Sequence, residues 1–187
     1  MSSSTEARTP VAEVDGAKAL RALYFVRFGF AIVWAGLLAL TASTLTPFAI
    51  ALLVIYPLFD VAAAVVDLRS SGAARPRVPL YANMALSLLT AVGLAVAVTS
   101  GIPSVLRVWG AWAIAAGIVQ LIVAVLRYRL GGQWPMILSG GLSAVAGTTF
   151  VVQAAGTAAS LTNVAGYAAV GGVFFLISAI RLHLRGR

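Results

Sequence analysis

Two charged residues lie inside stretches that are otherwise apolar, and they are the first candidates for chemistry in this sequence. Arg27 follows Arg21 by six positions, and Asp60 precedes Asp67 by seven. At about 1.5 Å per helical residue, each charge would lie roughly 10 Å inside the end of its apolar segment. Because a charge in hydrocarbon is costly, an ionisable residue at such a place is a functional hypothesis by default.

The two apolar segments are joined by a short turn, so they are expected to be antiparallel neighbours with Arg27 and Asp60 at similar depth. One interpretation is a buried ion pair that locks the two segments together, with Arg27 alternatively extending to the lipid head groups. The other interpretation is a proton- or ion-responsive site. The sequence leaves both open.

Polar residues near the predicted charge pair favour the second interpretation. Pro57 lacks an amide donor and bends a helix, which frees the carbonyl of Leu53, and interrupted helices often mark transport sites. Tyr56 precedes this proline, and the next two apolar segments contribute Asn83 and Gln120. Against this interpretation, proline also occurs in membrane helices that have no transport role.

His183 is the single histidine, and it lies among Arg181, Arg185 and Arg187 at the end of the last apolar segment. Because a histidine titrates near neutrality, His183 is a candidate pH sensor. A side chain that only faces the head groups is the alternative.

Residues for most enzymatic chemistry are missing from the sequence. It has no cysteine and one histidine, so the usual metal or haem ligands cannot converge. Lys18, the only lysine, precedes the first apolar segment, which excludes a retinal Schiff base. Ser139 has no histidine partner for acyl transfer, and no phosphate-binding loop pattern occurs. We therefore predict a protein without enzymatic activity, metal or cofactor.

The elements that must position these residues are membrane helices. Hydrophobic residues make up 61% of the 187 residues, charged residues 10%, and the mean hydropathy is +1.00. A soluble domain averages roughly 45–50% apolar and about 25% charged residues, so the composition excludes an ordinary soluble chain, and a disordered one as well. The sequence predicts an all-α membrane protein.

Six apolar stretches, each about 20 residues or more as a spanning helix requires, cover residues 20–42, 46–69, 79–100, 104–129, 134–155 and 162–184. Residues 1–19 are polar and are predicted to be a flexible tail. Residues 20–187 are predicted to form one six-helix transmembrane domain.

The basic residues predict the orientation of the chain. The connections after the second and fourth stretches and both ends of the chain carry all but two of the 13 Lys and Arg residues, the exceptions being Arg27 and Arg107. By the positive-inside rule, both termini are cytoplasmic in a multi-pass protein of the plasma membrane. The net charge of +8 is then assigned to contacts with anionic lipid head groups, not to nucleic acid.

The sequence also indicates an internal repeat of three helical hairpins. A glycine recurs at matching places in the odd-numbered stretches, at Gly36, Gly93 and Gly147, and each is predicted to pack against another helix. The even-numbered stretches align without gaps around Asp60, Gln120 and Phe174.

Small residues spaced by four predict close packing between helices. Ser139, Ser143 and Gly147 form one stripe, and Gly117 and Gly172 belong to two others. Packing within the chain is one interpretation, and a homodimer face is the other.

The tryptophans divide by their depth in the predicted spans. Trp34 is deep enough to belong to the core. Trp109, Trp112 and Trp134 lie nearer to span ends, where an indole favours the membrane interface.

Hairpins of this form, with a glycine in the first apolar run, a short Pro/Thr turn and a second run ending in Ala and Arg, resemble the membrane repeat of the HdeD-like acid-resistance proteins. The resemblance spans residues 20–185, and the third hairpin, from Gln133-Trp134 through Gly147 to Arg181-Leu-His-Leu, carries it best. It implies a six-helix inner-membrane protein of bacteria, tied in some members to acid stress, with no reaction to carry over. Asp60 after Pro57 departs from the usual pattern, so a special role of Asp60 would belong to this chain.

Three functions fit the sequence. The first is a non-enzymatic inner-membrane protein related to acid stress. The second is a small channel or proton-coupled transporter that uses Arg27, Asp60 and Gln120. The third is an accessory subunit that packs against another membrane protein, and a homo-oligomer also fits. The lipid bilayer is the expected partner in every case.

Overall fold

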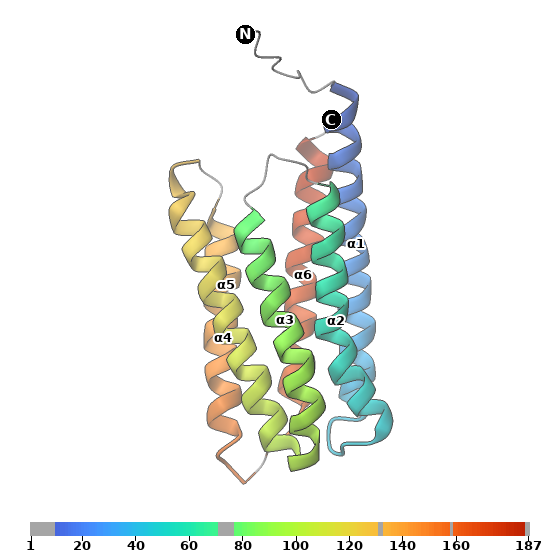
Figure 1. Cartoon of the computed structure of the whole chain (residues 1–187), viewed down its shortest axis with the longest axis vertical. Helices are drawn as coiled ribbons and strands as arrows, with labels where there is room; N and C mark the ends of the chain where they lie inside the picture. Colours follow the sequence, from blue (N-terminus) through green and yellow to red (C-terminus); the bar gives the residue numbers. More distant parts are fainter. Residues whose placement is uncertain (1–9, 71–76, 131–132, 158, 186–187) are drawn as a thin grey trace, which may run out of the picture.

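In the computed structural model, the chain folds into a bundle of long α-helices that run alternately up and down (Figure 1). The structure describes residues 10–70, 77–130, 133–157 and 159–185, and no strand occurs in these ranges. The helices are α1 (Pro10–Leu40), α2 (Pro47–Ser70), α3 (Arg77–Ala97), α4 (Ile102–Leu126), α5 (Trp134–Gln153) and α6 (Thr162–Arg185). The short 3₁₀ turns η2 (Val98–Ser100) and η3 (Tyr128–Leu130) follow α3 and α4.

Proline, threonine and glycine set where the helices begin. Pro47 and Pro103 lie in the first turns of α2 and α4, where an amide has no intrahelical acceptor to lose. The hydroxyl of Thr46 accepts a hydrogen bond from the N–H of Ala49 at 3.1 Å and so caps α2. Gly101, with φ of 86°, turns the chain between η2 and α4 in a conformation that glycine adopts without strain.

Each helix contains a segment long and apolar enough to cross a membrane. These segments are Lys18–Leu40, Pro47–Ser70, Arg77–Ser100, Ile102–Leu126, Trp134–Gln153 and Thr162–Leu184. They agree with the predicted spans to within a few residues at most ends. The chain is therefore a multi-pass integral membrane protein, and its outward-facing apolar side chains contact lipid.

α1 begins earlier than the first predicted span. Residues 10–19, which the sequence predicts as part of a flexible tail, are helical. A Cβ on Gly16 would lie 3.2 Å from the carbonyl oxygen of Ser70, so the first turns of α1 lie beside the end of α2. The apolar pattern missed these turns because they are polar, although alanine, glutamate and lysine are good helix formers.

α1 begins and α6 ends at the same end of the bundle, which is the upper end in Figure 1. We call it the arginine-rich end, because the helix turns near it carry Arg21, Arg69, Arg77, Arg127, Arg129 and Arg181. Three further arginines of the predicted basic face, Arg8, Arg75 and Arg187, lie outside the described residues. Arg107 lies near the opposite end, where its Nη2 is 3.5 Å from the carbonyl oxygen of Ala154.

Three pairs of helices pack most closely: α4 with α5, α1 with α6, and α2 with α3. α4 and α5 meet backbone to backbone at two pairs of glycines. A Cβ on Gly117 would lie 2.6 Å from the carbonyl oxygen of Gly140, and one on Gly147 would lie 2.5 Å from that of Gly110. Each of the three closely packed helix pairs joins helices from two different predicted hairpins. In contrast, α5 and α6, which make up the predicted third hairpin, touch each other sparsely.

Other predicted packing residues also lie at helix contacts. A Cβ on Gly172 of α6 would lie 3.1 Å from Ala31 of α1, and one on Gly93 of α3 would lie 3.2 Å from Val108 of α4. Ser143 lies in the contact between α4 and α5.

Gly36 is an exception, and the prediction that it packs against a helix is wrong. It is exposed, and a Cβ there would meet nothing within 4 Å. Its neighbours Trp34 and Leu38 turn the opposite face of α1 toward the core, which leaves Gly36 on the outer surface.

The half of the bundle away from the arginine-rich end has a tightly packed core. Its buried side chains, each at most 2% exposed, include Trp34, Leu38, Leu53, Leu94, Leu106, Trp109, Phe150, Leu161 and Val164. We call this region the sealed half.

Two tryptophans predicted for the membrane interface belong to the interior. Trp109 is fully buried and Trp112 is 9% exposed. The rings of Trp34, Tyr56, Trp109 and Trp112 pack together with centroids 4.5 to 6.0 Å apart. The prediction used distance from the span end, whereas burial depends on which face of α4 carries the indole. Trp134, 64% exposed, lies at the start of α5 and so at the end of its span, as predicted.

Candidate functional site

Arg27 of α1 and Asp60 of α2 form an ion pair inside the bundle. Nη2 of Arg27 donates a hydrogen bond to Oδ1 of Asp60, and the two side chains are 16% and 10% exposed. The structure thus brings together the two charges that the sequence places at equal depth. Arg27 turns inward to this partner and does not extend to the head groups.

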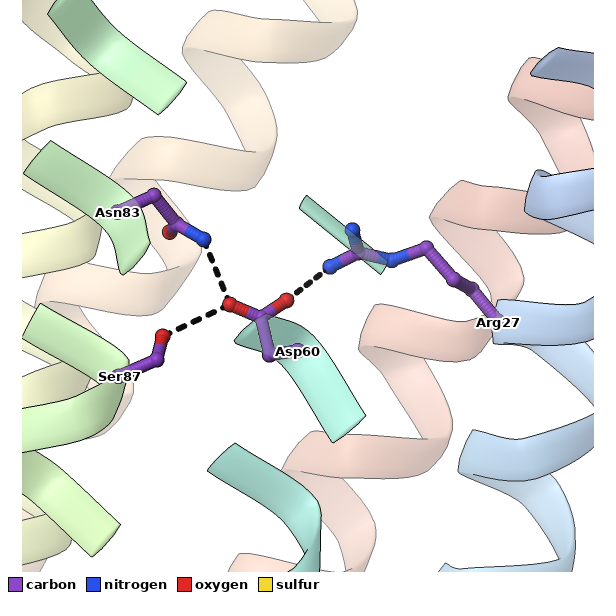
Figure 2. A network of polar contacts seen from close by, with 4 residues as sticks. All are labelled: Arg27, Asp60, Asn83 and Ser87. Carbon is purple, nitrogen blue, oxygen red and sulfur yellow. Dashed lines mark hydrogen bonds and ion pairs between the residues drawn. The ribbon is translucent and has the colours of Figure 1, made fainter. Parts of the chain in front are cut away.

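Asp60 also binds α3 (Figure 2). Its Oδ2 accepts a hydrogen bond from Nδ2 of Asn83 at 2.6 Å and one from Oγ of Ser87 at 2.8 Å. Asn83 is a predicted site residue. Ser87 was missed, although it follows Asn83 by four positions and therefore lies on the same helix face. The carboxylate of Asp60 joins α1, α2 and α3.

Arg27 contacts a fourth helix through its other side. Its guanidinium carbon lies 4.2 Å from the centroid of the Phe175 ring of α6, a cation–π contact. Its Nε is buried and has no hydrogen-bond partner. Arg27 is therefore held by two helices while its buried Nε–H stays unpaired.

A cavity of about 370 Å³ lies beside this ion pair, in the half of the bundle toward the arginine-rich end. Ligand sites typically measure about 300–1,000 Å³. All six helices contribute to the lining, and its polar side chains include Arg27, Tyr56, Asp60, Asn83, Gln120, Gln133, Ser139, Ser143, Tyr167, Ser178 and Arg181. We call this region the cavity half.

Three buried polar atoms in this lining have no hydrogen-bond partner: Nε of Arg27, Nε1 of Trp112 and Oε1 of Gln120. Buried polar groups in proteins are nearly always paired, with protein or with bound water. Ser143 and Tyr167, also in the lining, are bonded to each other at 3.0 Å. The three unpaired atoms are therefore candidate hydrogen-bonding groups for a partner bound beside them.

The cavity carries more positive than negative charge. Arg27 and Arg181 both line it, and Asp60 is the single carboxylate among the described lining residues. By formal charge, two arginines and one aspartate give the described lining a surplus of one positive charge.

Tyr56 and Pro57 form the boundary between the cavity and the sealed half. Tyr56 lines the cavity and packs on Trp34, with ring centroids 4.5 Å apart. Pro57 is fully buried, and since it has no N–H, it cannot donate to the carbonyl of Leu53. The neighbouring carbonyl of Leu52 accepts the indole N–H of Trp34 at 2.7 Å, which ties α1 to α2 beside the proline.

His183 lies apart from this site. Its exposed ring is near the arginine-rich end, where Nδ1 is 3.0 Å from Nη1 of Arg21. Because a guanidinium only donates, Nδ1 of His183 is the acceptor in this contact. His183 does not line the cavity.

Trp112, Tyr167 and Phe175 are site residues that the sequence did not indicate. Each is an aromatic residue within a long apolar run, where nothing in its spacing separates a cavity wall from a packed core. Tyr167 and Trp112 do carry one signal, because a buried phenol or indole N–H needs a hydrogen-bond partner.

No family model matches the chain, and neither the curated proteins nor the solved structures include a match. The arguments on function below therefore rest on the geometry of this chain.

Proposed function

We propose that this protein is a non-enzymatic membrane transport protein, and that the cavity beside Asp60 is its binding site for a small polar solute. The observation that carries this proposal is a cavity of about 370 Å³ within membrane-spanning helices, whose lining residues include an ion pair and three residues with an unpaired buried polar atom. Intramembrane charges that face an internal cavity are typical of solute and ion pathways. A lining that served packing alone would be filled by apolar side chains.

The sealed half favours a carrier over an open channel. Trp34, Trp109 and Phe150 fill the bundle beyond the cavity and are at most 2% exposed, so no open path continues through them. A one-sided cavity corresponds to a carrier with its site open toward one membrane face. Pro57 beside the site fits this class, because interrupted helices often form the binding sites of transporters.

The arginine-rich end would face the cytoplasm. This orientation is supported by the positive-inside rule, and it places the basic side chains among anionic head groups. The same proposal includes the resemblance to the HdeD-like repeat. That resemblance implies a bacterial inner membrane, an origin from three hairpins and a role in acid stress. A carrier of a small solute is compatible with such a role.

An accessory-subunit function has less support. Gly117, Ser143 and Gly147 of the predicted small-residue stripes are occupied by the contact between α4 and α5, so these stripe residues offer no surface to another protein. An enzymatic role is also less supported, because Ser139 and Ser143 in the cavity have no histidine near them among the described lining residues.

Transport can be tested through the cysteine-free sequence, in which one introduced cysteine is the only thiol. Ser139 lines the cavity, whereas its neighbour Leu138 does not and is 47% exposed on the outer surface. Vesicles containing Ser139→Cys are assayed for exchange of three membrane-impermeant solutes: benzenesulfonate, choline and mannitol. A bulky methanethiosulfonate reagent is then added.

We expect at least one solute to exchange faster than in protein-free vesicles, and modification of Ser139→Cys to block that exchange. Leu138→Cys is the matched control, at the same depth but facing lipid, where a thiol stays protonated and reacts slowly. Exchange of none of the solutes, or exchange that continues after Ser139→Cys is fully modified, would refute the proposal.

A further inference from the structure

The donors and acceptors in the cavity are unequally occupied. The carboxylate of Asp60 already accepts three hydrogen bonds, from Arg27, Asn83 and Ser87. A carboxylate offers about four lone-pair sites, so Asp60 has little capacity left to bind a cation. A hard cation such as Ca²⁺ would need roughly six or more oxygen ligands, and Asp60 is the only described carboxylate in the lining.

The donors, in contrast, are not all used. Arg27 gives Asp60 one hydrogen bond through Nη2, because the second oxygen of Asp60 is taken by α3. Nε of Arg27 is left buried without an acceptor. A guanidinium favours two parallel bonds to a carboxylate, so Arg27 retains the capacity to bind a second anionic group.

Trp112 adds an indole N–H, a group that can only donate a hydrogen bond. Its side chain is 9% exposed and lines the cavity, and its Nε1 is buried without a partner. An indole N–H has no acceptor capacity, so the missing partner must be an acceptor. Among the described lining residues, Oε1 of Gln120 is the one fully buried acceptor without a partner, and it suits a hydroxyl group or a water that enters with the solute.

The walls of the cavity suit an apolar body. Tyr56, Tyr167, Phe174 and Phe175 line it together with Trp112. An apolar cavity of about 150 Å³ holds benzene, so 370 Å³ is enough for an aromatic ring with an acidic substituent and some water.

We propose that the solute of this site is a small organic monoanion, with its acidic group on Arg27 and the indole N–H of Trp112 and its apolar body against the aromatic wall. This inference rests on the proposed transport function and specifies its substrate class. The surplus of one positive charge matches a monoanion, and Arg181 in the lining attracts the anion toward the site.

The test measures binding of four probes to the purified protein by titration calorimetry: benzoate, benzamide, benzylamine and chloride. The three organic probes share one ring and differ in charge. We expect benzoate to bind at least about tenfold more tightly than benzamide or benzylamine, because only benzoate pairs with the desolvated guanidinium. Chloride is expected to bind more weakly, because it makes no contact with the aromatic wall.

Trp112→Phe is the informative variant, since it removes the N–H and keeps an aromatic ring. We expect it to weaken benzoate binding roughly tenfold, the usual loss for a hydrogen bond to a charged group. Trp109→Phe is the matched control: its Nε1 is also buried and unpaired, but Trp109 does not line the cavity. Benzoate affinity should not change in Trp109→Phe.

A second variant covers the case in which Trp112→Phe does not fold. Arg181→Gln changes a partly exposed residue of the lining, and we expect it to slow benzoate association about threefold at low salt and to reduce the salt dependence.

Each result has a distinct meaning. Tighter binding of benzylamine or benzamide, or equal benzoate affinity in Trp112→Phe and the wild type, would overturn the anion assignment while solute exchange through Ser139→Cys could still stand. Equal affinities for chloride and benzoate would overturn the assignment of an organic anion and indicate a halide as the solute. If no probe binds and no solute exchanges, the transport function itself fails.

Discussion

The two halves of this bundle are built from the same six helices but are filled in different ways. In the sealed half, Trp34, Leu106 and Phe150 interlock with at most 2% of their surface exposed. In the cavity half, the same helices leave about 370 Å³ open beside a buried ion pair. The difference follows the helix pairing, because α5 and α6 touch each other sparsely and both line the cavity.

The comparison separates stability from function within one fold. Lipid tails are as apolar as leucine, so membrane helices associate mainly through close packing and hydrogen bonds. The sealed half provides close packing. The cavity half gives up packing and leaves three polar atoms unpaired, which costs free energy unless a ligand binds. Under the proposed transport function, the sealed half holds the bundle together and the cavity half is kept open for a solute.

The largest expected effect comes from breaking the ion pair of the cavity half. Asp60→Ala leaves Arg27 buried without its anionic partner, and removing one partner of a buried pair typically costs about 3–5 kcal/mol. The free energy of unfolding can be measured by SDS titration in mixed micelles.

The control for this prediction is the double variant Arg27→Ala/Asp60→Ala. Since it leaves no unpaired charge, its loss should be smaller than the sum of the two single losses by about 2 kcal/mol. Simple addition of the single losses would show that the two charges do not stabilise each other.

A smaller effect distinguishes the packing of the two halves. Leu106→Ala opens a void in the sealed half, where Leu106 is fully buried. In lipid the free energy of moving the side chain from water to an apolar core largely disappears, and the loss of packing contacts remains. We therefore expect the free energy of unfolding to fall by about 2 kcal/mol. Leu142→Ala widens an existing cavity and should cost less than about 0.5 kcal/mol. Equal losses in the SDS titration would contradict the division into a sealed half and a cavity half.

Much of this arrangement could be predicted from the sequence, and the reasons are physical. Span length is set by the bilayer, so the six apolar runs predicted the six spans to within a few residues, although α1 begins earlier, at Pro10. The short turn between α1 and α2 forces these helices to be antiparallel neighbours, so counting residues from Arg21 and Asp67 placed Arg27 and Asp60 at one depth.

The helix pairing and the cavity could not be predicted in this way. Depth says nothing about which face of a helix turns inward, so Trp109 was assigned to the interface and Gly36 to a helix contact. The cavity arises where α5 and α6 separate, and that separation depends on the glycine contacts that pull α5 onto α4. The stripe of Ser143 and Gly147 signalled a contact but not its partner helix.

The smallest expected effect compares two indoles of one cluster and tests how hydrogen bonding is distributed within the sealed half. Trp34 donates its N–H to the carbonyl oxygen of Leu52 at 2.7 Å, whereas the N–H of Trp109 is buried and unpaired. Trp34→Phe and Trp109→Phe remove the same atoms from rings that stack 5.4 Å apart. The packing losses should therefore be similar, and only Trp34→Phe loses a hydrogen bond.

We expect Trp34→Phe to be the less stable variant by about 1 kcal/mol in the SDS titration, the usual net contribution of a hydrogen bond. Equal stabilities would mean that the hydrogen bond from Trp34 to Leu52 adds nothing to the free energy of unfolding. Greater loss in Trp109→Phe would mean that its N–H has a partner in the membrane, and the sealed half would then contain a polar site of its own.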